Sequence, residues 1–303
     1  MEFLKSIIID NETPAADGMY SYVLPVNPVS HLILTICALN TGGAEATAAQ
    51  ICDMVTNVHV LHRGTTVLQM SANDLLALNH VLFAKTPMRG QQSATISDIT
   101  WLSLVIPFGR KMYDPNECFP QSRAGELQIQ LTVGIADAVL TGLILQLEAV
   151  ELYGANPARH LKVTTIVDDA LVVGDNDIRL PIGNPYAGIL MFSTTKPTST
   201  LWTTTIDQVK LLANNKEHYV SSANWESLRG ELVNRPGMEA GYLTAIGLYG
   251  HDHIAQYAYI DFDPRRSDLF LMETAGMNAL ILRITGGDTE EARVFPVELR
   301  ATS

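Results

Sequence analysis

Charged residues are scarce in this chain of 303 residues. They make up 17% of the sequence while hydrophobic residues make up 47%, and an ordinary globular protein has about 25% charged residues. A surface with so few charges associates readily unless other subunits cover it. We therefore expect an obligate oligomer.

Basic residues are the scarcer of the two charge classes. The chain has 20 basic and 32 acidic residues, a net charge of −12, and Lys5 is the one lysine or arginine in the first forty residues. A nucleic-acid-binding arm needs clustered lysine and arginine to neutralise phosphates. We expect no direct contact with nucleic acid.

Cysteine and long apolar runs are also in short supply. The three cysteines, Cys37, Cys52 and Cys118, all lie in the first half of the chain, which excludes a repeated disulfide framework and favours reduced thiols. The most apolar stretch, residues 134–152, is interrupted by acidic side chains such as Glu148, so it does not predict a membrane span. The apolar run at the N-terminus is shorter than a signal peptide requires, and we expect no export signal.

Catalytic motifs are missing as well. The sequence contains no GxSxG, GxxxxGK[ST], GxGxxG, CxxC or HExxH pattern, and these patterns carry the nucleophile, phosphate, dinucleotide, redox and zinc chemistry of common enzyme families. We predict that the protein is not an enzyme. We also predict no catalytic, cofactor-binding or metal-binding residues and no cofactor.

Two clusters contain side chains that can bind metal ions. His251 and His253 are two residues apart, so on a strand both imidazoles would point the same way, but two ligands do not complete a metal site and a polar turn is the favoured interpretation. Asp175 and Asp177, with Asp168 and Asp169 upstream, offer oxygen ligands without the spacing of an EF-hand. A solvated turn is the favoured interpretation there.

Two further pairs have simple structural interpretations. Cys52 and His59 would form a nucleophilic pair only if the fold joined them to an orienting group, and a buried cysteine is the favoured alternative. Arg265 and Arg266 could contact an acidic neighbour across an interface, but an isolated basic pair is usually just exposed.

What the chain does contain is an internal duplication. Five short matches occur in the same order in its two halves, with separations of 157, 156, 156, 151 and 147 residues. They are Lys5 with Lys162, Gly18 with Gly174, Leu24-Pro25 with Leu180-Pro181, Ser71-Ala72-Asn73 with Ser222-Ala223-Asn224, and Val150-Glu151-Leu152 with Val297-Glu298-Leu299. Slowly drifting offsets are typical of two copies of one domain with small insertions. We predict domains at residues 1–156 and 157–303, joined by the Gly154–Pro157 linker.

Each copy has the pattern of a β-sandwich with one short helix. Asn27-Pro28 and Asn184-Pro185 predict corners between two strands, because proline cannot donate to a strand ladder. The Ser-Ala-Asn triplets predict helix starts, capped by their serine or asparagine. Apolar residues at helical spacing follow them, namely Leu75, Leu78 and Leu82 in the first copy and Trp225, Leu228 and Leu232 in the second. Later strands are predicted within residues 99–109, 126–134, 143–152, 256–263, 278–286 and 292–299. The predicted fold class is all-β with short helices, as two tandem antiparallel jelly rolls.

This architecture resembles the double jelly-roll major capsid proteins of tectiviruses, corticoviruses and adenoviruses. The resemblance extends from Lys5 to Leu299 and rests on the duplication, the size and the order of strands, corner and helix. It implies a structural protein of an icosahedral virus or phage shell, which forms pseudo-hexameric homotrimers. Duplicating a domain lets a three-fold oligomer present a nearly hexagonal outline.

The resemblance also implies partners and a location. The partners would be further copies of the chain, neighbouring capsomers, and vertex (penton) and minor capsid proteins. An internal membrane could be contacted by residues 1–9, through Phe3, Leu4 and Ile7-Ile8-Ile9. The protein would reside in the virion capsid after assembly in the host cytoplasm, as a compact coat protein of bacteriophage type.

Two alternatives remain open at this stage. A bicupin-like metalloenzyme would use His251 and His253, but the positions expected to hold its glutamate hold Tyr257 and Ala258. A tandem carbohydrate-binding protein would need an exposed aromatic platform. The tryptophans available for it are Trp101, Trp202 and Trp225, and we expect the first and last in the core.

Overall fold

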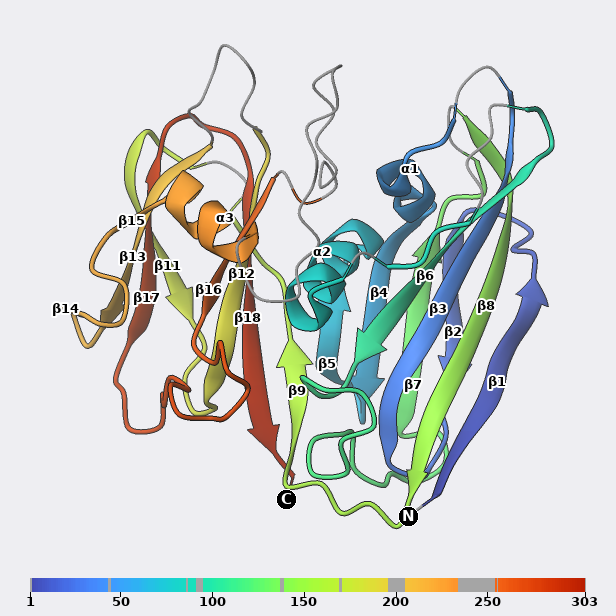
Figure 1. Cartoon of the computed structure of the whole chain (residues 1–303), viewed down its shortest axis with the longest axis horizontal. Helices are drawn as coiled ribbons and strands as arrows, with labels where there is room; N and C mark the ends of the chain where they lie inside the picture. The colour runs from blue at the N-terminus through green and yellow to red at the C-terminus, as the bar shows by residue number, and fades with distance from the viewer. Residues whose placement is uncertain are drawn as a thin grey trace. The chain divides into compact units, whose positions relative to one another are not determined.

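The chain folds into two compact units. The computed structural model describes residues 2–42, 45–85, 87–90, 95–136, 139–168, 171–195, 205–233, 254 and 256–302. The first unit is Met1–Val163 with Ala301–Ser303, and the second is Thr164–Arg300 (Figure 1). The domain limits proposed from the sequence, 1–156 and 157–303, differ from these units by the segment after the linker and the last three residues.

The first unit contains two packed β-sheets. The first sheet has the strand order β1 (Glu2–Glu12), β8 (Leu140–Tyr153), β3 (Val29–Asn40) and β6 (Ile99–Pro107). The second has the order β9 (Arg159–Val163), β5 (Thr65–Met70), β4 (Val55–His62), β7 (Leu127–Val133) and β2 (Gly18–Val23). These neighbours are antiparallel apart from β5 and β9, which are parallel.

The second unit repeats this arrangement. One sheet has the order β10 (Ile166–Asp168), β18 (Ala292–Ala301), β12 (Tyr186–Ser193) and β16 (Tyr257–Asp261). The other has the order β11 (Gly174–Leu180), β17 (Leu280–Gly286), β13 (Ile206–Ala213) and β14 (Lys216–Glu217), and β15 (Ala223–Asn224) also pairs with β13. In chain order, β18-β12-β16 corresponds to β8-β3-β6, β10 corresponds to the later part of β1, around Ile9, and β14-β13-β17-β11 corresponds to β5-β4-β7-β2. This connectivity of two facing four-stranded sheets is that of a jelly roll, so the predicted pair of sandwiches is confirmed.

Strict alternation along the strands builds each core. In both β7 and β17 every second residue is buried, beginning with Leu127 and Leu280. Alternate residues of a strand point to opposite faces of the sheet, so one face of each strand enters the sandwich while the other faces outward. Because both layers of a unit follow this rule, a continuous apolar core lies between them.

The helices follow the sandwich strands. Helix α2 (Ala72–Phe83) begins after Ser71, whose hydroxyl accepts the Asp74 amide at 3.1 Å, while the Asp74 carboxylate accepts the Ser71 amide at 3.3 Å. This capping box satisfies two N–H groups that a helix start leaves unpaired. Helix α3 (Trp225–Val233) is its counterpart. The leucines predicted at helical spacing, Leu78 and Leu228 among them, are buried.

The structure decides between the two predicted caps of α3 and adds a helix. Ser222 is not the residue before α3, because β15 pairs with β13 and keeps the chain extended as far as Asn224, the other predicted cap, which directly precedes the helix. The first unit also has a second helix, α1 (Ala48–Asp53), which was not predicted. Its sequence signal was a capping box between Thr47 and Gln50.

Helix α2 also protects a sheet edge. The Asn79 side chain accepts the Val105 amide at 2.7 Å and donates to the Val105 carbonyl at 2.6 Å. Val105 lies on β6, the last strand of its sheet. An edge strand left open invites pairing with another chain, so this asparagine closes part of the β6 edge.

The two Asn-Pro corners share one hydrogen-bonding scheme. The Asn27 side chain donates to Glu151 at 2.7 Å, and the Asn184 side chain donates to Glu298 at 2.6 Å. Both carboxylates are buried, and a buried charge needs hydrogen-bond donors. The amide after each glutamate donates to the proline carbonyl of the corner, Leu152 to Pro28 at 2.7 Å and Leu299 to Pro185 at 2.8 Å.

A shared irregularity follows each corner. One register shift falls between Val29 and His31 where β3 pairs with β8, and the other falls between Tyr186 and Gly188 where β12 pairs with β18. A bulge of this kind bends a strand and re-aims its side chains. Repetition of the hydrogen bonds and of the bulge at matching places confirms the duplication.

Candidate assembly surface

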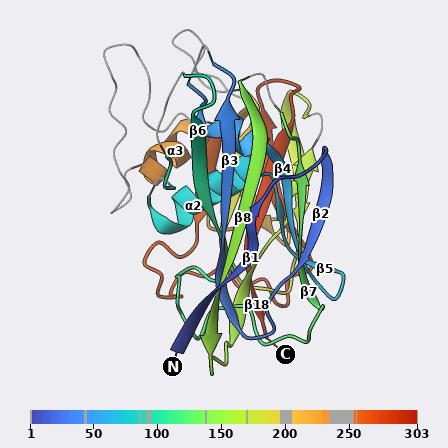
Figure 2. The same ribbon diagram turned by 90° about the vertical axis from the view of Figure 1, so that its right-hand side faces the viewer.

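The first unit exposes one apolar sheet face. On β3 the residues Leu32, Leu34 and Ile36 are completely buried, whereas the alternate residues are only half-buried. The outward residues of the sheet are Ile33, Thr35 and Cys37 on β3, Trp101, Ser103 and Val105 on β6, Ile144, Gln146 and Glu148 on β8, and Phe3, Lys5 and Ile7 on β1. We call this set the apolar sheet face. Figure 2 shows its four strands broadside, with no element of the first unit in front of them.

Strand register orders the apolar sheet face into rows. Ile33 lies between Glu148 and Val105, and Cys37 lies between Ile144 and Trp101. Between these rows, Thr35 shares a hydrogen bond with Ser103, with 2.8 Å between the hydroxyl oxygens. The rows are therefore mostly aliphatic, aromatic or hydroxyl-bearing, which suits a desolvated contact.

The outer strand of this face is the most exposed part. Phe3 and Ile7 on β1 are each 63% exposed. Between them, the Lys5 ammonium lies 2.5 Å from the Glu148 carboxylate, so the charges on this face neutralise each other. A contiguous apolar surface with paired charges indicates a protein contact rather than a surface that stays in contact with solvent.

The outward faces of the second sheets differ between the units. In the first unit this face carries no charged side chain on β7 and β2, with Gln128 and Gln130 on β7 and Met19 and Val23 on β2, the last two 63% and 55% exposed. Residue His59 on β4 bonds Thr66 at 3.0 Å, and burial lowers its pKa. The strands β4, β7 and β2 of the first unit therefore present uncharged side chains on this face as well.

In the second unit the matching face is charged. Arg283 donates two hydrogen bonds to Asp177, at 2.6 and 2.8 Å, and lies 3.7 Å from Asp175. The hydrogen bond from Arg283 lowers the pKa of Asp177. Such exposed ion-pair ladders keep a surface solvated and contribute little to stability.

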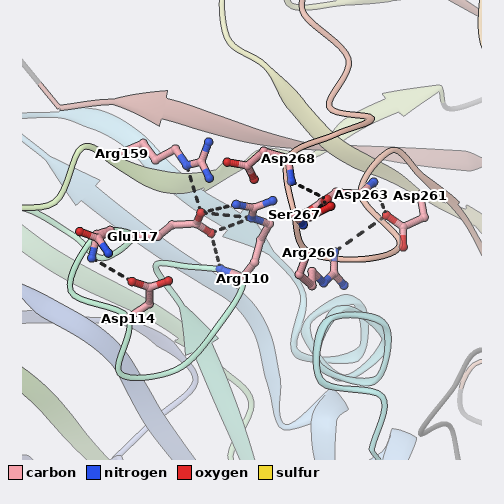
Figure 3. A network of polar contacts seen from close by, with 10 residues as sticks. Arg110, Asp114, Glu117, Arg159, Asp261, Asp263, Arg266, Ser267 and Asp268 are labelled. Carbon is pink, nitrogen blue, oxygen red and sulfur yellow. Dashed lines mark hydrogen bonds and ion pairs between the residues drawn. The ribbon is translucent and has the colours of Figure 1, made fainter.

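A buried carboxylate braces the loop between β6 and β7. Glu117 accepts hydrogen bonds from the Arg110 amide at 2.6 Å, from the Arg110 guanidinium at 2.6 Å and from Arg159 at 3.1 Å (Figure 3). Burial alone raises the pKa of Glu117, but the arginines outweigh it and hold the pKa below its ordinary value. The loop carries Tyr113, whose ring packs edge-on against Phe3 at 5.4 Å.

The equivalent loop of the second unit uses an aspartate. The buried Asp263 carboxylate accepts the amides of Ser267 and Asp268 at 2.9 and 3.0 Å (Figure 3). The loop then exposes Leu269 and Phe270, which are 68% and 46% exposed. Both units thus hold an apolar loop tip in place with a carboxylate that accepts backbone amides.

The candidate metal ligands are not brought together. His251 and His253 lie outside the described residues, as does Asp169. Asp175 and Asp177 form the ladder with Arg283 described above. Within the described ranges, no three histidine, cysteine, aspartate or glutamate side chains are grouped so that they could hold a metal.

The other candidates have structural roles. Cys52 lies fully buried in α1, where burial raises its pKa and keeps the thiol protonated, whereas His59 faces outward on β4. Arg265 is exposed, and Arg266 lies 3.9 Å from Asp261.

Of the two tryptophans predicted in the core, Trp225 is there and Trp101 is not. Trp225 is completely buried, as expected. Trp101 was predicted in the core and is instead half-buried on the apolar sheet face. Trp202 lies outside the described residues. The alternation in residues 99–107 carried the missing signal, because burial of Leu102 and Leu104 turns Trp101, Ser103 and Val105 outward.

Solved structures from virus shells are similar to this chain over nearly its full length. The chain is similar to the major capsid protein P2 from Bacteriophage PM2, with a TM-score of 0.67 and 15% identity over 99% of this chain and 98% of that one. It is also similar to a chain in the atomic structure of Sulfolobus Turreted Icosahedral Virus, with a TM-score of 0.74 and 13% identity over 99% and 91% of the two chains. The chain has the double jelly-roll fold.

A third double jelly roll extends the range of that likeness. A chain of the PBCV-1 virus capsid matches with a TM-score of 0.65 and 9% identity, covering 98% of this chain and 93% of the other. No protein-family model and no curated protein matches the sequence. At these identities the likeness shows the fold, which a divergent sequence retains through its strand order.

Proposed function

We propose that this protein is a major capsid protein, which builds the shell of an icosahedral virus or phage. The observation that carries the proposal is the full-length likeness to double jelly rolls that are themselves major capsid proteins. The uncovered apolar sheet face supports a role in assembly. We assign the two jelly-roll domains to residues 1–156 and 157–303.

The assembly unit in this proposal is a homotrimer. Two similar sandwiches per chain give six similar lobes per trimer, and a closed ring of copies repeats one interface. The apolar sheet face is that interface, because its aliphatic and aromatic rows need a partner that excludes water. The charged ladder of Asp177 and Arg283 stays in contact with solvent.

Light scattering of the purified protein tests this. We expect a particle of about three times 33.1 kDa, with a hexagonal outline by negative staining. Ile33→Lys should dissociate it, with the dissociation constant rising roughly tenfold or more, about 1.4 kcal/mol per tenfold. Ile281→Lys is the matched control, since Ile281 is also a half-buried isoleucine on an outward sheet face, beside Arg283 on the charged one. A monomer that turns over a small molecule would refute the proposal.

The remaining partners follow from this role. They are neighbouring capsomers, vertex and minor capsid proteins, in a virion capsid assembled in the host cytoplasm, without direct contact to nucleic acid. Residues 1–9 are the proposed contact to an internal membrane, with Leu4 exposed on the side of β1 opposite the apolar sheet face. None of the helices in the described part of the chain has the length and apolar character to span a bilayer. Flotation of Leu4→Ser protein with liposomes, compared with unmodified protein, tests this contact, and equal flotation of the two would contradict it.

A further inference from the structure

The first strand of the second copy, β9, shows how two sheets can be joined edge to edge. Lys162 on β9 corresponds to Lys5 on β1 in the duplication, yet β9 belongs to the first unit. There it lies parallel to β5, with Val163 opposite Leu68. The first strand of the second copy therefore pairs with β5 of the first copy, which is the second strand of the β4–β5 hairpin.

The counterparts of these two strands end their sheets. Strand β1 is the last strand beside β8, and β14, the counterpart of β5, is the last strand beside β13 in the sheet order of the described residues. Edge strands carry unpaired amide and carbonyl groups that template pairing with another chain. One chain thus has two open edge strands, β1 and β14. Their counterparts in the other copy, β9 and β5, are already paired with each other.

We infer that β1 of one copy pairs in parallel with β14 of the next copy, so that sheets continue from chain to chain. This inference rests on the proposed function and names the edge that links its subunits. The pairing is head-to-tail, because it joins different strands of the two copies, and such a contact closes into a ring when the rotation allows it.

The duplication sets the register of this pairing. Leu68 lies opposite Val60 in the first hairpin, and the counterpart of Val60 is Leu211. The Leu211 carbonyl accepts the His218 amide and its amide donates to the Val220 carbonyl, both at 2.9 Å, which places the segment around Tyr219 opposite it. Aligning that segment with Ser6, the counterpart of Val163, sets Leu4 against Glu217.

Avoidance of like-charge contacts favours this occupant over self-pairing of β1. In this register Phe3 lies opposite Lys216 and Leu4 lies opposite Glu217, so no like charges are directly opposed at β14. Antiparallel pairing of two β1 strands about Ser6 would instead set Glu2 against Asp10, and directly opposed like charges destabilise a sheet. Phe3, 63% exposed, would be covered by the new neighbour.

Disulfide trapping tests the pairing. In a Cys37→Ser background, Leu4→Cys and Glu217→Cys are combined in one chain and the protein is oxidised mildly with oxidised glutathione. Adjacent strands bring Cα atoms within the range a disulfide spans. We expect a covalent trimer on non-reducing gels, and no covalent product from either single variant. Leu4→Cys with Asn278→Cys is the control, since Asn278 is exposed in a turn before β17.

The outcomes separate the two proposals. A trimer by light scattering that stays uncrosslinked overturns the β1–β14 pairing and leaves the proposed function standing. Covalent dimers from Leu4→Cys alone would mean that β1 pairs with itself, which overturns the inference. Equal crosslinking of the Asn278 control overturns it too. Absence of any oligomer overturns both proposals.

Discussion

The two units keep the same corner and differ in their outward faces. Asn27 with Glu151 and Asn184 with Glu298 make the same hydrogen bond at 2.7 and 2.6 Å. On the second sheets, by contrast, the outward face carries glutamine and threonine on β7 of the first unit and Arg283 on β17 of the second. The corner is inside each sandwich, where folding constrains it. The residues of an outward face are constrained by whatever contacts that face. Their divergence therefore indicates that the two units have different neighbours.

The largest effect we expect comes from the helix that each unit packs against its sandwich. Leu78→Ala and Leu228→Ala should each destabilise the protein by about 2–5 kcal/mol, because each leaves a cavity in a buried site. Calorimetric melts measure this. Glu231→Ala on the exposed side of α3 should stay within about 0.5 kcal/mol. If one leucine variant proved harmless, the helices would not be equivalent.

The corners should respond equally to loss of their asparagines. Asn27→Ala and Asn184→Ala each remove a donor from a buried carboxylate, which should cost about 1–3 kcal/mol. Denaturant midpoints measure the change, and the exposed Asn116→Ala serves as the control. A large effect in one unit and none in the other would break the equivalence of the corners.

Acid should distinguish the units. His31 lies opposite Val150, and burial, with a smaller contribution from Lys5, lowers its pKa to about 4 from 6.5. Its counterpart opposite Val297 is Gly188, which does not titrate. Because the unfolded chain binds the His31 proton more readily, stability should fall as the pH drops from about 6.5 towards 4. His31→Gln should flatten the stability profile in that window, and an unchanged profile would contradict this.

Below that window Glu117 should dominate. Its pKa is lowered in the folded state, so the stabilisation is present above the unfolded value of 4.5 and is lost as the pH falls through the folded value. Glu117→Gln should therefore reduce stability at neutral pH and weaken its dependence on pH below about 4.5. Urea titrations at several pH values measure both changes, and a parallel shift at all pH values would rule out this role for the carboxylate.

The smallest effect should come from the charged ladder. Asp177→Asn keeps the side-chain shape and removes an exposed charge beside Arg283. We expect no measurable change in Tm or in the oligomer, because solvent screens exposed ion pairs. Dissociation of the trimer by this variant would show that the charged face also takes part in assembly.

The sequence by itself determined the duplication, the strand positions and the buried leucines of both helices. Repeated short anchors and period-two alternation are local signals, and they survive in residues such as Leu24, Leu180 and Val209. Its low share of charged residues also predicts an oligomer.

Tertiary structure decided which alternate residues face outward together and which edges stay open. Ile33, Cys37, Trp101 and Ile144 come from three strands far apart in the chain, so only the register between strands gathers them into one face. The same holds for β15, whose pairing with β13 moved the start of α3 away from Ser222. Hydrogen bonds between strands far apart in the chain set these positions. The local sequence pattern of one strand does not identify the strand with which it pairs.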